Sequence, residues 1–184
     1  MKNTINIKTT LSVIVLTMGL LAACRDESVL VYDPAGTGVL GFYAHMIASP
    51  GGTVLVANAL TQTYVFTPEI VGAKGSEVTS FEIFAELTEA DGTGVKAKKL
   101  VATITTFPDD ATSKRPRGTI TVTAAQLNTA VGMGAPDYIA DRIIIYHTKL
   151  NMVSRGFVDE TNVNPNLSGV AYKAPFFHEV TIKP

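Results

Sequence analysis

The sequence contains one cysteine, Cys24, and no tryptophan among its 184 residues. A single thiol cannot form a disulfide within the chain, and no second cysteine remains for a thiolate metal site. Charge of either sign is also sparse, with 15 basic and 16 acidic residues. Neither nucleic acid nor an anionic lipid surface is therefore expected as an electrostatic partner. We also expect no cofactor and no bound metal.

The sequence also lacks an apolar run of membrane-spanning length, because the run at residues 11–21 is shorter than the about 20 residues that a bilayer needs. This run follows a basic start and ends in the tetrapeptide Leu21-Ala22-Ala23-Cys24. These are the parts of a secretory signal. The tetrapeptide resembles the lipobox of bacterial lipoproteins, which predicts cleavage before Cys24 and lipidation of its sulfur. An ordinary signal peptide with an incidental cysteine, or an uncleaved helix, is the alternative.

The chain is expected to have three parts: a lipoprotein signal peptide at residues 1–23, an acylated N-terminus with a flexible tether at 24–38, and one folded domain at 39–184. The acyl chains would make the membrane a partner of the protein. The charged tetrapeptide Arg25-Asp26-Glu27-Ser28 resembles the export signal that sends Bacteroidota lipoproteins to the outer face of the outer membrane. A solvated linker is the alternative interpretation of these four residues.

Most of residues 39–184 alternate between apolar and polar side chains, with Gly, Pro and Asp between the alternating runs. Period-two alternation predicts strands, and one apolar face per strand predicts antiparallel sheets. The strand at residues 63–70 is expected to turn Tyr64, Phe66 and Ile70 to the core and Thr63, Thr67 and Glu69 to solvent. We predict an all-β fold, an antiparallel β-sandwich of immunoglobulin or fibronectin type III character.

One short helix is expected to interrupt the strands. Thr123 and Gln126 form a capping box, in which the threonine hydroxyl accepts from the N3 amide and the glutamine reaches back. Gly132 suits the left-handed residue that ends a helix. We therefore predict a helix of about two turns at residues 124–131. Residues 143–152 are apolar on both faces and are expected to form the central strand that follows this helix.

Three segments carry a family resemblance: TITVTAAQLNTAVGM at 119–133, DRIIIYHTKL at 141–150 and NPNLSGVAYKAPFFHEVTI at 164–182. They resemble a family of Bacteroidota surface lipoproteins, and the strand-helix-strand part is similar to the N-terminal immunoglobulin-like domain of starch-utilisation accessory lipoproteins. The resemblance implies a surface location and a sandwich fold. It suggests glycan or nutrient capture beside an outer-membrane transporter or a binding lipoprotein. Its motifs are structural, so no ligand-binding residue can be carried over.

No catalytic residue is expected from the histidines of the chain. His45 and His147 have no second histidine or carboxylate at metal-ligand spacing. His178 is followed directly by Glu179, but neighbouring side chains on a strand point to opposite faces and cannot chelate together. His147 and His178 are therefore expected to be core or rim residues.

The serines and the paired carboxylates favour no reaction either. Ser154 lacks the leading glycine of a nucleophile elbow and is expected to lie in a hairpin turn. Asp109-Asp110 and Asp159-Glu160 lie in or beside predicted turns, where carboxylates are usually solvated. A glycosidase would need two carboxyl groups at a fixed separation across a cleft, and the sequence alone cannot place them so.

Four residues are speculative candidates for ligand binding. Arg115 and Arg117 belong to the densest basic cluster, whose guanidinium groups could hold an anionic sugar or a phosphate. Phe84, on a predicted wet face, and Tyr172, in a long loop, could contact a carbohydrate through their rings. The alternatives are a solvated loop for the arginines and sheet-surface packing for the aromatic residues.

The leading functional hypothesis is a non-catalytic surface lipoprotein that binds a ligand or a partner protein, as an accessory of outer-membrane glycan uptake. The alternative is a structural, adhesin or fimbria-associated surface subunit, which would share the anchor and the sandwich. The least favoured hypothesis is a hydrolase whose site assembles from Asp109, Asp159, Glu160 and a histidine.

Overall fold

A computed structural model describes residues 42–154, 156–163 and 176–184. The chain divides into two compact units, Met1–Tyr32 and Asp33–Pro184, and every described residue belongs to the second. The predicted signal peptide, Cys24 and the tether therefore lie outside the described residues. Within them, no helix is both long and apolar enough to cross a bilayer.

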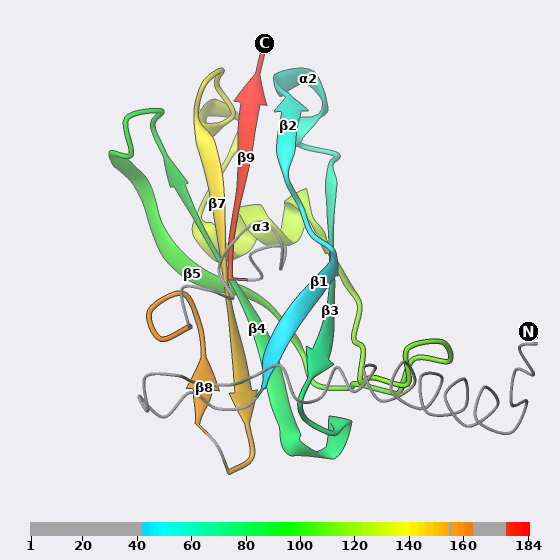
Figure 1. Cartoon of the computed structure of the whole chain (residues 1–184). Coiled ribbons are helices and arrows are strands. Elements are labelled where there is room, and N and C mark those ends of the chain that lie inside the picture. Colours follow the sequence, from blue (N-terminus) through cyan, green and yellow to red (C-terminus); the bar gives the residue numbers. More distant parts are fainter. Residues whose placement is uncertain (1–41, 155, 164–175) are drawn as a thin grey trace, which may run out of the picture. The chain divides into compact units, whose positions relative to one another are not determined.

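The second unit consists of two packed β-sheets (Figure 1). The three-stranded sheet has the order β1-β3-β6, and the six-stranded sheet has the order β2-β9-β7-β4-β5, with β8 paired to β7. The strands are β1 (Tyr43–Ala48), β2 (Gly52–Leu55), β3 (Thr63–Val71), β4 (Val78–Thr88), β5 (Gly94–Ile104), β6 (Ile120–Thr123), β7 (Ile143–Met152), β8 (Phe157–Val158) and β9 (Phe177–Lys183).

The distribution of strands between the sheets confirms the predicted immunoglobulin-like sandwich. β3 and β6 lie in one sheet while β4, β7 and β9 lie in the other, as strands B and E are separated from C, F and G in immunoglobulin domains. β7 lies between β4 and β9, so the strand predicted to be central is central. Its inner side chains enter the core, and its outer ones are half-buried.

One strand pair differs from the antiparallel expectation. After β1 the chain leaves the three-stranded sheet through Ser49, Pro50 and Gly51, and it joins the edge of the six-stranded sheet as β2. There β2 runs parallel to β9, with Val54 opposite Ile182. The first strand of the fold is therefore divided between the two sheets, which alternation of polarity cannot reveal, since both halves alternate in the same way.

The core forms where the apolar faces of the two sheets meet. Phe81 and Ile83 of β4 are fully buried, as the alternation predicts, and so is Ile144 of β7. The Tyr146 ring of β7 packs edge-on against Phe66 of β3, with centroids 5.2 Å apart. Each large apolar side chain buried in this way contributes about 1.5–3 kcal/mol by leaving water.

The predicted helix is confirmed as α3 (Ala124–Val131). Thr123 Oγ1 accepts from the Gln126 amide at 3.2 Å, and Gln126 Oε1 accepts from the Thr123 amide at 2.9 Å. Gly132 closes the helix with a φ of 74°. Three shorter helical segments were not predicted: α2 (Val56–Ala59), η2 (Gly75–Glu77) and η3 (Ala135–Asp137). Each is a single turn, too short for an apolar period to show.

The expectation for the polar side of β3 is wrong at two of its three positions. Thr63 is exposed, but Thr67 is 8% exposed and Glu69 is 3% exposed. The loop that precedes β6 folds over this end of β3, and a β-bridge joins Glu69 to Arg117. The polar side chains at this end of β3 therefore face the loop and not the solvent.

Candidate functional site

Four residues from four neighbouring strands form a row on the outer face of the six-stranded sheet. Phe84 of β4 lies opposite Leu100 of β5 on one side and opposite His147 of β7 on the other. His147 in turn lies opposite Phe177 of β9, and their rings meet edge-on with centroids 5.5 Å apart. We call Phe84, Leu100, His147 and Phe177 the outer-face row.

The outer-face row is only partly covered by the rest of the molecule. Leu100 is 48% exposed and Phe177 is 42% exposed, whereas Phe84 and His147 are half-buried. Two apolar side chains thus reach solvent at the ends of a row that has a polar ring in its middle. Ring faces next to fixed hydrogen-bonding groups suit a ligand with both apolar and polar surfaces.

Two carboxylates hold the imidazole of His147. Its Nδ1 lies 2.7 Å from Glu160 Oε2, and its Nε2 lies 3.0 Å from Glu86 Oε1. The Lys98 ammonium lies 3.4 Å from the other oxygen of Glu160. A neutral imidazole has one N–H and can donate to one of these carboxylates, whereas the doubly protonated ring donates to both. We call His147, Glu86, Glu160 and Lys98 the histidine cluster.

The histidine cluster does not have the arrangement of a catalytic site. Both ring nitrogens of His147 face carboxylates, so the ring has no hydroxyl or thiol to activate among the hydrogen bonds of the described residues. Within those residues, no group of three or more His, Cys, Asp or Glu side chains is placed to hold a metal ion. What the arrangement provides is a hydrogen-bonded set of polar and charged groups around His147, whose neighbours on the outer face are Phe84 and Phe177.

Sequence reasoning missed the histidine cluster because its members are far apart in the chain. Glu86 is 61 positions from His147 and belongs to a neighbouring strand. Glu160 is 13 positions away and reaches His147 from the turn after β8. The alternation of β4 does place Glu86 on the outer face, but only the register between β4 and β7 shows which side chain it meets.

A second polar cluster surrounds the buried Glu69 of β3. Arg117 Nη2 lies 2.5 Å from Glu69 Oε2, and Arg115 Nη1 lies 3.5 Å from Oε1. The Ser113 hydroxyl donates to Glu69 Oε2 at 2.7 Å. Arg117 also bonds Asp110, with Nη1 to Oδ2 at 2.8 Å. We call Glu69, Asp110, Ser113, Arg115 and Arg117 the Glu69 cluster.

The electrostatics of this cluster favour ionised carboxylates. Burial raises the pKa of Glu69, but the hydrogen bonds from Ser113 and Arg117 and the Arg117 charge outweigh burial and leave the pKa below its ordinary value. For Asp110, the hydrogen bond from the backbone N–H of Ser113 is the largest influence, and with that of Thr112 and the Arg117 charge it lowers the pKa although desolvation acts to raise it. The cluster therefore fastens the loop before β6 to β3 through charge-assisted hydrogen bonds.

This geometry places the two candidate anion-binding arginines in a structural role. The guanidinium of Arg117 is shared between Glu69 and Asp110, and that of Arg115 faces Glu69. Their positive charge is thus matched by carboxylates of the same chain. Binding of an external anion by Arg115 and Arg117 stays a prediction.

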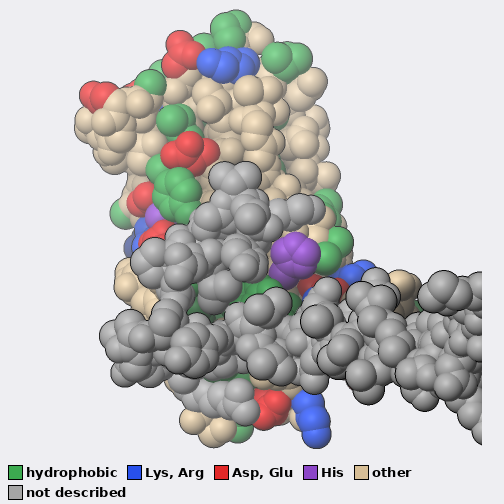
Figure 2. Space-filling view, in the orientation of Figure 1, with side chains coloured by type: hydrophobic (Ala, Val, Ile, Leu, Met, Phe, Trp, Pro, Cys, Tyr) green, Lys and Arg blue, Asp and Glu red, His purple; other side chains and the backbone are tan. Residues whose placement is uncertain are grey.

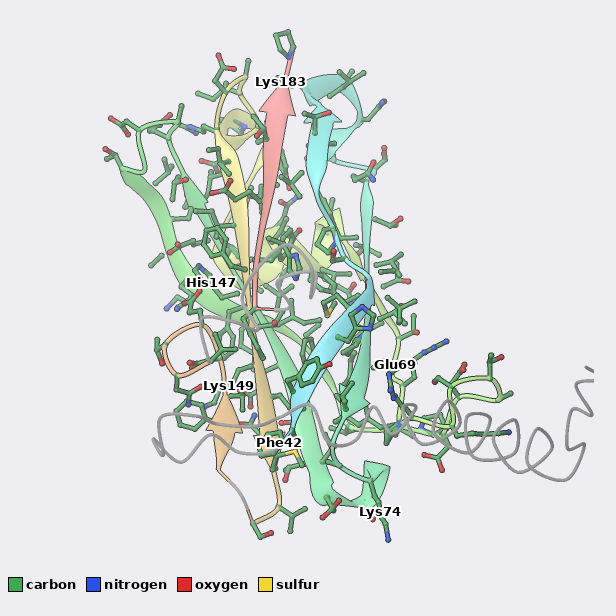
Figure 3. The ribbon with its side chains drawn as sticks, in the orientation of Figure 1. Phe42, Glu69, Lys74, His147, Lys149 and Lys183 are labelled. Carbon is green, nitrogen blue, oxygen red and sulfur yellow. The ribbon has the colours of Figure 1, made fainter. Side chains whose placement is uncertain are left out.

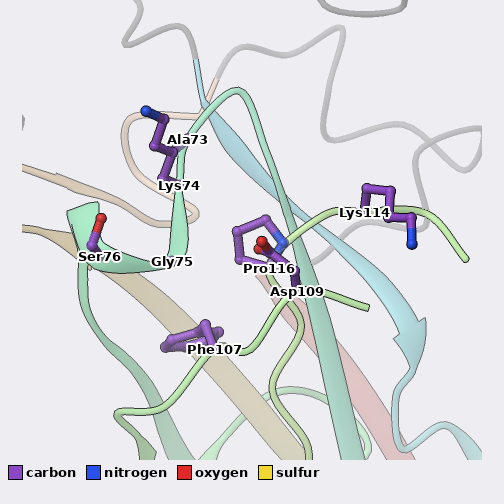
Figure 4. A pocket seen from close by; sticks show the side chains of 8 residues that line it. All are labelled: Ala73, Lys74, Gly75, Ser76, Phe107, Asp109, Lys114 and Pro116. Atoms are coloured by element: carbon purple, nitrogen blue, oxygen red, sulfur yellow. The ribbon is translucent and has the colours of Figure 1, made fainter. Parts of the chain in front are cut away.

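The same loop borders a pocket of about 450 Å³ (Figure 4). Its residues are Ala73, Lys74, Gly75, Ser76, Phe107, Asp109, Lys114 and Pro116. The side chains of Lys74 and Lys114 point away from each other and do not converge on one point (Figure 4). A Cβ on Gly75 would lie 2.3 Å from the Phe107 carbonyl oxygen, so the turn before β4 and the loop can approach only because residue 75 is glycine.

The remaining candidates are distributed over the molecule. Tyr172 and Cys24 lie outside the described residues. His178 is 9% exposed and its ring meets Phe66 edge-on in the core, as expected of a core histidine. Of the hydrolase residues, Glu160 contacts His147, but Asp109 lines the pocket beside Gly75, and none of the hydrogen bonds described above joins the two.

No family model matches this chain, and no curated protein matches it. Among solved structures, a bacterial adhesin from Mobiluncus mulieris containing intramolecular disulfide, isopeptide and ester bond cross-links matches with 10% sequence identity and a TM-score of 0.29. The match covers 77% of this chain and 57% of the adhesin chain. At that TM-score the likeness carries no argument, so the class of the protein is the one that its own fold defines, an immunoglobulin-like β-sandwich.

Proposed function

We propose that the protein is a non-catalytic, lipid-anchored surface protein of the bacterial outer membrane, and that its sandwich binds a glycan for an uptake system. The outer-face row is the observation that supports binding: ring surfaces lie next to donors and acceptors that the histidine cluster holds in place. The lipobox at residues 21–24 supports the anchor. Among the described residues, the histidine cluster places no hydroxyl or thiol beside the imidazole, and in the Glu69 cluster the Ser113 hydroxyl meets a carboxylate whose lowered pKa makes it a weak base, which favours binding over catalysis.

A carbohydrate fits the outer-face row better than an ion does. A sugar ring has an apolar face of C–H groups and an edge of hydroxyls, so it can lie on the ring of Phe177 or Phe84 while its hydroxyls donate to the carboxylates of Glu86 and Glu160. The two carboxylates of the histidine cluster exceed its one ammonium, Lys98, by one charge, which disfavours an anionic ligand. A neutral glycan is therefore the proposed ligand class.

A glycan array tests this proposal with matched variants of the mature chain. Wild-type protein is expected to bind neutral glycans, and the double variant Phe84→Ala/Phe177→Ala is expected to lose binding. Ile47→Ala is the control, because Ile47 lies on β1 in the other sheet and is 40% exposed, close to the 42% of Phe177. If the wild-type protein binds no glycan on the array, or if the Ile47 variant loses binding equally, this ligand site loses its support.

The anchor and the location are tested in cells. Labelled palmitate is expected to enter the wild-type protein but not Cys24→Ser, and protease added to whole cells is expected to digest the mature chain. Pull-down with the anchored protein is expected to recover an outer-membrane transporter or a binding lipoprotein. Protection from the protease would contradict the outer-face location and leave the glycan site to be judged by the array.

A further inference from the structure

One flank of the sandwich carries no charged side chain over a long segment. Residues 46–68, from the end of β1 through β2 and α2 into β3, contain no Asp, Glu, Lys, Arg or His. We call this segment the uncharged flank. Figure 2 shows the part over β2 and α2 mostly in green and tan. Lys183 lies opposite Leu55 on β9, and Asp141 pairs with it at 3.3 Å.

The uncharged flank also exposes many large apolar side chains. Half of the exposed large hydrophobic residues in the described part of the chain lie in it: Ile47 (40%), Leu55 (48%), Val56 (36%), Leu60 (49%) and Val65 (39%). A hollow of about 240 Å³ joins its elements, since Ala48, Gly51, Thr53, Thr63 and Val65 all line it. Clustered exposed apolar groups without charge are typical of the core of a protein interface.

Two sheet edges reach this flank. β1 is the first strand of one sheet and β2 is the first strand of the other, and among the described strands each has a single partner. The backbone groups of Gly52–Leu55 that turn away from β9 therefore meet no other described strand. An unpaired edge is a template for another strand.

The opposite flank has the usual protection of a sheet edge. Its edge strand β5 carries Lys96, Lys98 and Lys99, and it is irregular in its pairing with β4. The helix α3 also packs against β5. Lysines, bulges and a covering helix are the devices that prevent one edge from adding to another. The two flanks thus differ in charge, in exposed apolar side chains and in protection.

We propose that the uncharged flank binds a second copy of this chain, forming a two-fold dimer around β2 and α2. Removal of Lys2 and Lys8 with the proposed signal would change the formal charge from −1 to −3, so two copies would carry net charge of the same sign and repel each other. The uncharged flank can approach itself without that repulsion. A two-fold axis brings the same patch of both copies together, and antiparallel β2 strands pair across such an axis. This inference goes beyond the proposed function and does not depend on glycan binding, but its charge argument rests on the proposed cleavage before Cys24.

The mass of the mature lipoprotein in detergent tests the dimer. Wild-type protein is expected to have the mass of two chains in light scattering. Leu55→Lys is expected to weaken the dimer about tenfold or more, because a two-fold interface receives each new charge twice. Leu100→Lys is the matched control, since Leu100 is also 48% exposed but lies on β5, and it is expected to leave the dimer intact. A single-chain mass for the wild type, or equal weakening by both variants, would overturn the proposal.

Cross-linking in membranes provides an independent measurement. Full-length Leu55→Cys is expected to give a two-chain band with a bifunctional thiol reagent, whereas the wild type, whose one thiol is Cys24, and Leu100→Cys are expected to give little. A ladder of larger species would favour a fibre subunit and overturn the closed dimer. A single-chain mass, with binding to phosphatidylethanolamine–phosphatidylglycerol vesicles that Leu55→Lys abolishes, would assign the flank to the membrane and also overturn it.

Discussion

The Glu69 cluster and the histidine cluster use the same kinds of side chain but differ in burial. Glu69 has a side chain that is 4% exposed and meets two arginines, whereas Glu86 and Glu160 have side chains that are 28% and 29% exposed. Figure 3 shows Glu69 on β3 near the loop before β6 and His147 on β7. The Glu69 cluster fastens the loop before β6 to β3. The half-exposed one can also meet a ligand.

The largest expected effect is a loss of stability when the Glu69 cluster is changed, which distinguishes it from the histidine cluster. Glu69→Gln leaves the charges of Arg115 and Arg117 beside an amide in a buried place. Because both arginines are partly exposed, we expect a loss of about 2–3 kcal/mol in the free energy of unfolding, below the range for a fully buried pair. Urea unfolding followed by circular dichroism measures it.

Glu86→Gln is the matched variant in the histidine cluster, and we expect it to cost less than about 1 kcal/mol, as partly exposed pairs do. Equal losses for Glu69→Gln and Glu86→Gln would remove the distinction between a structural and a ligand-binding cluster.

Next in size is the packing of the loop that holds the Glu69 cluster. In Gly75→Ala the new methyl group would lie against the Phe107 carbonyl oxygen, so the loop must shift, at a cost of about 1–2 kcal/mol. A Cβ on Gly51 would meet no atom within 4 Å, so Gly51→Ala is the control, with a change within about 0.5 kcal/mol. Thermal unfolding compares them, and equal melting temperatures would contradict the close approach.

A pH dependence is expected from the buried cluster. The pKa of Glu69 is lower in the folded chain than its ordinary value of 4.5, so the unfolded chain binds the proton more readily. The stability from Glu69 is therefore present above about pH 5 and is lost as pH falls through the folded pKa. Unfolding at a series of pH values should show the gap between wild type and Glu69→Gln narrowing under acid. A constant gap would contradict the cause given for the lowered pKa.

The smallest expected stability effect belongs to the histidine cluster itself. His147→Gln keeps one donor and removes the bridge between Glu86 and Glu160. The free energy of unfolding is expected to change by less than about 1 kcal/mol. Glycan binding is expected to fall at least about tenfold, because the ring is part of the outer-face row. Isothermal titration beside urea unfolding separates the two effects. Unchanged binding would exclude His147 from the site.

The fold was predictable where local patterns and global packing agree. The alternation in β4, the run that is apolar on both faces in β7 and the capping box of α3 each specify an element by themselves, and all three elements are confirmed. The division of the first strand between β1 and β2 was not predictable, because it depends on which sheet has an open edge. α2 was missed because a single turn has no apolar period.

Less of the candidate site could be predicted from the sequence, because the site depends on how the strands pair. Phe84 was found because the alternation of its own strand places it on the outer face. The register between the strands decides that His147 and Phe177 lie beside it, and the sequence does not show that register. Glu69 was expected in solvent, since nothing local shows that a loop 40 to 50 positions further along the chain covers it. Side-chain contacts between strands could therefore not be predicted, even where each strand itself was predicted correctly.

A residue-resolved NMR titration of the mature chain with a neutral glycan that binds on the array tests the central claim most directly. The account predicts that the largest shift changes fall on Phe84, His147 and Phe177, with Arg115 and Arg117 unchanged. Changes centred on the arginine loop, with the outer-face row silent, would contradict it.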